Sequence, residues 1–256
     1  MKKNVFLLGL LWLLTALPSQ AQLKTVVIDA GHGGKDPGSK GKIVKEKDIA
    51  LKIALKTGEL IQKNFPDVTV VYTREDDVFI ELEERSAIAN RVHADLFISI
   101  HCNASDSKAA YGTETYIMGM HKNNDNLEVA MRENSVILQE DNYQERYQKF
   151  NPQNMISYIR MANYQSAYQV QSADFARRVE DQFKERVRRT SRGVKQSGFL
   201  VLWQTSMPSV LIEVGFISNP TEEQYLRSAL GQDYIASGIY RAFKEYKQSL
   251  EALAAD

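Results

Sequence analysis

Two histidines and two glutamates are the residues of this sequence whose types and positions could do chemistry. His32 and His101 each follow a run of β-forming apolar residues, and Glu46 opens the helical pattern after the first run. Since the carboxyl ends of parallel strands meet at one edge of a sheet, we expect these three side chains to meet in one crevice. Two imidazoles and a carboxylate with an open fourth position form the ligand set of a catalytic zinc site. The sequence therefore predicts a zinc site there.

Each of the three residues also has a structural interpretation. His32 could hydrogen-bond the glycine-rich loop 31–41, Glu46 could simply favour a helix N-terminus, and His101 could be a strand-end histidine with satisfied hydrogen bonds. Their spacing is not that of the HExxH motif. The residues alone leave these alternatives open.

The fourth candidate, Glu213, lies within the apolar segment VLIEVGF. A carboxylate inside a buried strand is costly unless it is paired, protonated or next to a metal. The segment is followed by a loop and a helix, so Glu213 can face the same crevice and act as general base toward a metal-activated water. The structural alternative is a buried ion pair with an arginine such as Arg85 or Arg74.

The elements that position these residues alternate along the chain. Helical spacing of apolar residues predicts helices over 46–65 and 81–92. The segments expected to form strands begin at Val26 and cover 68–73, 96–100, 112–118, 198–203 and 209–214. This alternation predicts an α/β fold: a single domain with a twisted, largely parallel or mixed sheet of about six strands and helices on both faces.

Residues 120–171 interrupt this pattern. They are rich in Asn, Gln, Tyr and charged residues, with helical spacing only over 127–138 and 155–162. One interpretation is a solvated surface excursion; the other is a lid or regulatory segment, because loops of this length are uncommon otherwise. After it, Ser172 is expected to cap a helix, and Asn219 a later one with Pro220 at its first position and Glu222 as the capping-box acid.

The N-terminus is typical of a secretion signal peptide covering residues 1–21. Lys2 and Lys3 precede an apolar run, and small residues flank the expected cut after Ala21. The run is too short for a membrane span, so we expect an exported protein without stable membrane insertion, whose domain covers 22–256. The formal net charge of zero gives no indication of a basic surface for nucleic acid, which we do not expect as a partner. Cys102 is the only cysteine, so the chain cannot form an internal disulfide.

Several longer motifs carry a family resemblance. IDAGHGGKDPGS, YTREDDVFIELEERSAIAN, SIHCNA and MPSVLIEVGFISNP occur in this order, and together they resemble the zinc-dependent N-acetylmuramoyl-L-alanine amidases of the amidase type 3 family. The resemblance implies that His32, Glu46 and His101 bind one Zn²⁺ and that Glu213 is the catalytic glutamate. It implies hydrolysis of the amide between the lactyl group of N-acetylmuramic acid and L-alanine of the peptidoglycan stem peptide, during cell separation or wall turnover in the periplasm or cell-wall space.

In some members of this family, a helix in the corresponding insertion covers the zinc until an activator protein displaces it. Segment 120–171 lies at that place, and Glu128, Glu133 and Glu140 are acids that could reach the metal. The sequence does not choose among them. Many relatives carry an arginine where Trp203 stands, which leaves the role of Trp203 open.

Two other functions remain to be distinguished. A zinc carboxypeptidase or endopeptidase would use the same site to cut within the stem peptide, and a catalytically silent wall-binding protein would keep only the fold. The complete set of His32, Glu46, His101 and Glu213 argues against the silent protein.

Overall fold

The computed structural model describes residues 22–162 and 167–253. The predicted signal peptide, 1–21, lies outside the described residues. The strands form one mixed sheet in the order β2-β1-β3-β6-β4-β5, in which β1, β2, β3 and β6 run parallel and β4 runs antiparallel to β6. This confirms the predicted α/β class. The strands are β1 Thr25–Ala30, β2 Thr69–Tyr72, β3 Leu96–Asn103, β4 Thr113–Met118, β5 Ser191–Ser197 and β6 Ser209–Phe216.

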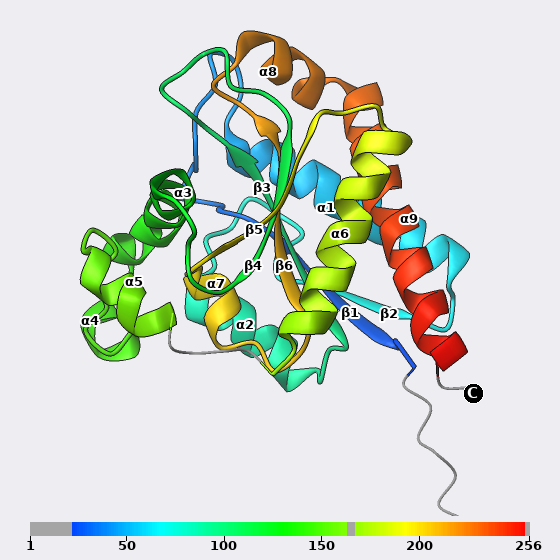
Figure 1. Cartoon of the computed structure of the whole chain (residues 1–256), viewed down its shortest axis with the longest axis horizontal. Helices are drawn as coiled ribbons and strands as arrows, with labels where there is room; N and C mark the ends of the chain where they lie inside the picture. The colour runs from blue at the N-terminus through cyan, green and yellow to red at the C-terminus, as the bar shows by residue number, and fades with distance from the viewer. Residues whose placement is uncertain (1–21, 163–166, 254–256) are drawn as a thin grey trace, which may run out of the picture.

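Helices cover both faces of this sheet, as Figure 1 shows. Three of them, α1, α6 and α9, lie on one face, and α2 and α7 lie on the other with the insertion. The helices are α1 Glu46–Asn64, α2 Leu82–Arg91, α3 Asn124–Asn134, the 3-10 helix η1 Ser135–Gln139, α4 Tyr143–Arg146, α5 Met155–Ala162, α6 Gln169–Glu185, α7 Leu200–Trp203, α8 Pro220–Arg227 and α9 Ala229–Leu253. None of the described helices is both long and apolar enough to span a membrane.

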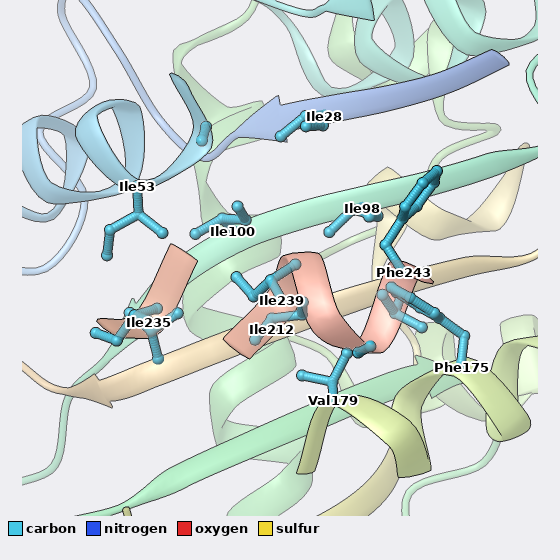
Figure 2. Close-up of a cluster of buried hydrophobic side chains, with 14 of the residues drawn as sticks. Ile28, Ile53, Ile98, Ile100, Phe175, Val179, Ile212, Ile235, Ile239 and Phe243 are labelled. Carbon is cyan, nitrogen blue, oxygen red and sulfur yellow. The ribbon is translucent and has the colours of Figure 1, made fainter. Parts of the chain in front are cut away.

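The first face of the sheet is apolar along its central strands. Ile28, Ile98 and Ile212 of the three central strands pack there against the helices (Figure 2). Each fully buried side chain of this size contributes roughly 1.5–3 kcal/mol to folding. Figure 2 also shows the helical residues that meet them: Ile53 of α1, Phe175 and Val179 of α6, and Ile235, Ile239 and Phe243 of α9.

The second face changes character along the strands. Val27, Phe97 and Leu211 pack into a second apolar cluster. Because side chains alternate between the two faces of a strand, the next residues on this face toward the carboxyl ends include His101 and Glu213, both buried. The strand pattern thus brings polar side chains to one edge of the second face.

One predicted strand is wrong. Residues 200–203 of the segment 198–203 form the short helix α7, and the sixth strand is β5. The apolar run GFLVLW fits a buried helical turn as well as a strand, and α7 packs into the second cluster. β5 is an edge strand with sequence SRGVKQS, in which no apolar alternation marks a strand.

The described part of the insertion is packed against the body. Leu127, Ile137 and Tyr158 lie in the second apolar cluster together with Phe199 and Leu200. The interpretation of this segment as a solvated excursion is therefore wrong for residues 120–162.

The predicted helix starts are right at one position and wrong at another. The Asn219 side chain accepts hydrogen bonds from the backbone N–H groups of Thr221 and Glu222, with Pro220 at the first helical position. Ser172 caps no helix, because α6 already begins at Gln169; its hydroxyl instead accepts a hydrogen bond from the backbone N–H of Ser209.

Candidate metal centre

Four buried side chains from four parts of the chain meet at the carboxyl edge of the sheet. His32 lies on the loop after β1, Glu46 is the first residue of α1, and His101 lies in β3. The fourth is Glu133 of α3, in the insertion. One ligand atom from each residue lies within 4.8 Å of the other three, so the cluster could hold a metal ion.

The distances within the cluster leave polar atoms facing one another. Nε2 of His32 lies 3.1 Å from Oε1 of Glu46 and 3.1 Å from Oε2 of Glu133. Nδ1 of His101 lies 3.1 Å from the same two oxygens. Nε2 of His32 and Oε2 of Glu133 are buried and accept or donate no hydrogen bond within the described structure. A cation among these atoms would satisfy both, and imidazole with carboxylate is a donor set that zinc accepts.

The backbone at two glycines lies against the rings of the two histidines. A Cβ atom on Gly31 would lie 2.4 Å from Cε1 of His101, and one on Gly38 would lie 2.6 Å from Cδ2 of His32. His32 itself has φ of 61°, a left-handed conformation that is strained for a residue other than glycine.

Two buried arginines hold the loop in this conformation. Arg85 donates to the carbonyl oxygens of Ala30 and His32, and Arg74 donates to those of Ala30 and Gly31. Arg85 also forms a buried ion pair with Asp29. The arginines considered as partners for Glu213 therefore serve the His32 loop instead.

Further hydrogen bonds orient the ligand side chains. Nδ1 of His32 lies 2.7 Å from Oδ2 of Asp36, so Nε2 is the nitrogen that faces the cluster. Glu46 accepts hydrogen bonds from the backbone N–H groups of Ser39, at 2.7 Å, and Cys102, at 2.8 Å. Such supporting contacts set the tautomer and direction of metal ligands. Sequence reasoning missed Asp36; its position four residues after His32 in the glycine-rich loop was the available signal.

Glu213 lies next to the cluster. It pairs in register with His101 across β3 and β6 and is fully buried. Neither carboxylate oxygen has a hydrogen-bond partner within the described structure, and the Nη2 atom of Arg132 lies 3.9 Å from Oε1. Burial raises the pKa of Glu213 well above its usual value, and the neighbouring Glu133 and Glu46 raise this pKa further. A free carboxylate in this position is suited to accept a proton.

The charges of the cluster favour a cation. Burial opposes the ionisation of Glu46, but His32 and His101 together outweigh it and lower the pKa of Glu46 to about 2. Burial likewise opposes the charged form of His101, but the neighbouring Glu133 and Glu46 carboxylates raise the pKa of His101 to about 9. Without a metal, protonated imidazoles supply the positive charge between the two carboxylates. A metal ion bound to the neutral imidazoles can supply this charge instead.

Of the three acids of the insertion considered above, Glu133 alone joins the cluster. Glu140 accepts hydrogen bonds from the Leu82 backbone and the Tyr147 hydroxyl, and Glu128 lines a cavity to one side. Trp203 packs beside the second apolar cluster and is not one of the four clustered residues.

Comparison with known proteins shows the family of the chain. The family model described as N-acetylmuramoyl-L-alanine amidase matches residues 26–245. The chain is 31% identical over 226 residues to the N-acetylmuramoyl-L-alanine amidase AmiC of Escherichia coli O6:H1, covering 86% of this chain and 52% of AmiC. It thus spans about half the length of that relative.

Two solved structures are similar throughout the fold. A crystal structure of N-acetylmuramoyl-L-alanine amidase from Clostridium difficile 630 has 30% identity and a TM-score of 0.66, covering 89% of this chain and 98% of that one. The CwlD amidase of Clostridioides difficile, solved in complex with the GerS lipoprotein, has 28% identity and a TM-score of 0.66, covering 88% and 99%. On the match over residues 26–245, the chain belongs to the N-acetylmuramoyl-L-alanine amidase family of hydrolases.

Proposed function

We propose that this chain is a zinc-dependent amidase that cleaves the bond between the lactyl group of N-acetylmuramic acid and L-alanine in peptidoglycan. His32, Glu46 and His101 are the zinc ligands, and Glu213 is the general base. The observation that carries the proposal is the buried, unsatisfied Nε2 of His32 facing the other ligand atoms, with the Glu213 carboxylate, which accepts no hydrogen bond within the described structure, beside them.

The metal and the surrounding residues have separate roles in the proposed reaction. When bound, zinc supplies a Lewis acid that polarises the scissile carbonyl and acidifies the attacking water. Glu213 accepts the proton of that water and returns it to the leaving amine of L-alanine. Asp36 holds the His32 ring in the tautomer that leaves Nε2 free, and the backbone around Ser39 and Cys102 holds the Glu46 carboxylate.

Glu133 closes this site in the resting protein. A catalytic zinc site keeps a position open for water or substrate, whereas Glu133 adds a fourth protein ligand atom to the cluster. The adjacent Arg132 donates to the Asn103 side chain and the Ala104 carbonyl and lies 3.9 Å from Glu213. Residues 120–171 are then a regulatory lid, and α3 must move before substrate reaches the zinc.

An activator protein releases the lid by binding its outer surface. Met155, Ile156 and Ile159 of α5 are 51%, 56% and 49% exposed and form an apolar stripe one helical turn long. Such patches on soluble proteins mark protein interaction sites. The similar CwlD amidase was solved in complex with a lipoprotein, which supports a protein partner for this chain.

Export follows from the same function. Peptidoglycan lies outside the cytoplasmic membrane, and residues 1–21 have the pattern of a cleavable secretion signal. The mature protein, residues 22–256, then acts in the periplasm or cell-wall space, in cell separation or wall turnover.

Product analysis with and without a chelator tests the function. Purified muropeptides should yield intact stem peptides with a free L-alanine amine, and chelation should abolish this product until Zn²⁺ is restored. Release of only terminal amino acids would identify a carboxypeptidase. Binding of peptidoglycan without any product, also after Glu133→Ala, would identify a wall-binding protein.

A further inference from the structure

A polar cavity of about 470 Å³ lies beside Glu213, on the β4–β5 side of the candidate metal centre. Glu114 of β4 pairs in register with Glu213 and lines this cavity. Adjacent strands are about 4.8 Å apart, so the cavity begins one strand away from the proposed general base. Arg132 of α3 also lines it and separates it from the metal centre.

The wall formed by the body of the protein is basic. Its four cations are Lys40, Lys108, Arg192 and Lys195, and we call this surface the basic wall. Arg192 and Lys195 both donate to Oε1 of the buried Glu114, Lys195 at 2.6 Å. One carboxylate thus pairs with two cations, and Asp106 is the other acid on this side of the cavity. Neither Lys40 nor Lys108 forms an ion pair among the described residues, so the basic wall keeps an excess of positive charge.

The opposite wall is formed by α3 and is acidic. Asp125 and Glu128 lie three residues apart, on the same side of this helix, and both line the cavity. In the resting protein these two carboxylates face the basic wall. If α3 moves away from the metal centre, Asp125 and Glu128 no longer face the basic wall. The basic wall can then bind another anion.

We propose that the basic wall binds the free carboxylate of the stem peptide and that the acids of α3 occupy its place in the resting protein. The second residue of a stem peptide is linked through its γ-carboxyl group, which leaves its α-carboxylate free. That carboxylate lies one residue beyond the scissile amide, so in this proposal an amide next to Glu213 places it toward the cavity on the side of Glu114, the register partner of Glu213. The inference rests on the proposed function, because it takes the scissile amide to lie at the metal centre.

The test uses two N-acetylmuramoyl tetrapeptides that differ at one group, a free α-carboxylate or an α-carboxamide on the second residue. Their dissociation constants are measured by calorimetry on the zinc-loaded full chain with Glu133→Ala and Glu213→Gln, so that neither ligand is hydrolysed. We expect the carboxylate ligand to bind roughly tenfold to hundredfold more tightly, as is typical of hydrogen bonds to a charged group.

Substitutions on the two walls should change this preference in opposite directions. Lys195→Gln and Arg192→Gln, tested singly so that Glu114 keeps one cation, should remove most of it, whereas Arg192→Lys should retain it. Asp125→Asn with Glu128→Gln should increase it, because two competing carboxylates are neutralised. Melting temperatures close to that of the parent show that each variant is folded.

Arg177→Gln is the matched control. Arg177 is an exposed arginine of α6 that pairs with Asp174 and Asp181 and does not line the cavity, so its loss should leave the preference unchanged. Equal affinity for the two ligands, binding of neither, or a preference that survives both Lys195→Gln and Arg192→Gln would overturn the inference. A carboxylate preference without hydrolysis by the Glu133→Ala protein would refute the amidase proposal and leave the subsite standing.

Discussion

At the level of single residues, Glu133 is the group that we propose closes the metal centre. Its Oε2 atom lies 3.1 Å from both histidine nitrogens, and in the proposed mechanism it occupies the position that substrate or water needs. No other acid of the described insertion reaches the cluster. The resting state therefore depends on one carboxylate.

Glu133→Ala should raise the basal amidase activity roughly tenfold or more, equivalent to about 1.4 kcal/mol of barrier. The reason is that the substitution opens a ligand position without removing His32, Glu46 or His101. Dye release from labelled peptidoglycan measures the rate. Asp141→Ala changes an exposed acid of the same insertion and should have no effect; an unchanged or lower rate for Glu133→Ala would contradict autoinhibition.

Asp36 supports the centre without touching the other ligands. Its hydrogen bond to Nδ1 of His32 keeps Nε2 directed at the cluster. Asp36→Asn should weaken zinc binding by roughly 10-fold to 100-fold, the usual range for such supporting residues. Competition with a chromogenic chelator measures this affinity. The exposed Asp106→Asn is the comparison, and equal affinities for the two variants would remove Asp36 from the site.

At the scale of elements, one asparagine joins the lid to the body. Asn134, the last residue of α3, donates to the Gly198 carbonyl and the Tyr158 hydroxyl and accepts from the Leu200 backbone N–H. All of these groups are buried. The position of α3 over the metal centre therefore depends on contacts to the segment before α7 as well as on Glu133.

Asn134→Ala should loosen α3, because a buried backbone donor and acceptor lose their partner at a cost of about 1–3 kcal/mol each. We expect faster hydrogen exchange over residues 124–134 and a higher basal activity, with exchange in β1, β3 and β6 unchanged. Gln144→Ala, at an exposed residue of the same insertion, serves as control. Unchanged exchange in α3 would show that the asparagine does not hold the lid.

The elements also show what sequence patterns can predict. Helix α1 and the central strands β1, β3 and β6 were predictable because their apolar residues recur with clear periods. The short apolar run at α7 fitted either element, and the polar edge strand β5 had no pattern to reveal it. The insertion showed no continuous stripe because its apolar residues come from several short helices that pack together only in the folded chain.

The candidate site was predictable to the extent that topology alone determined it. His32, Glu46 and His101 come together because parallel strands end at one edge, and Glu213 follows from its apolar strand. The choice of Glu133 among three acids depends on the path of the insertion, which no local pattern specifies. The same holds for the arginines: Arg85 pairs with Asp29 and not with Glu213 because of the packing of α2.

At the scale of the whole molecule, Asp29 and Arg85 link the sheet to the loop that carries His32. Asp29 is fully buried, accepts hydrogen bonds from Thr73 and Ser99, and pairs with Arg85. Burial alone would raise the pKa of Asp29, but Arg85 and the two hydroxyl groups lower it below its ordinary value of 3.8. The ionised form of Asp29 therefore stabilises the folded state.

Asp29→Asn should cost about 3–5 kcal/mol at pH 7, because Arg85 is left buried without its counter-ion. A lowered pKa contributes stability above the unfolded value and loses it as the pH falls through the folded value. The difference between the two proteins should thus be constant from pH 5 to pH 7 and shrink below about pH 4. Urea unfolding in the presence of chelator measures it. If the difference in unfolding free energy between the two proteins instead grew toward acid pH, the lowered pKa of Asp29 would be contradicted.

The role of Glu213 is tested most directly by zinc content and turnover in Glu213→Gln, made in the full chain with Glu133→Ala so that the site is open. We expect about one zinc per chain and a loss of at least roughly 100-fold in muropeptide hydrolysis, since a general base contributes about 10²–10⁴-fold. His101→Ala in the same background should lose the zinc instead. Normal turnover by Glu213→Gln, with zinc bound, would contradict the assignment of Glu213 as the general base.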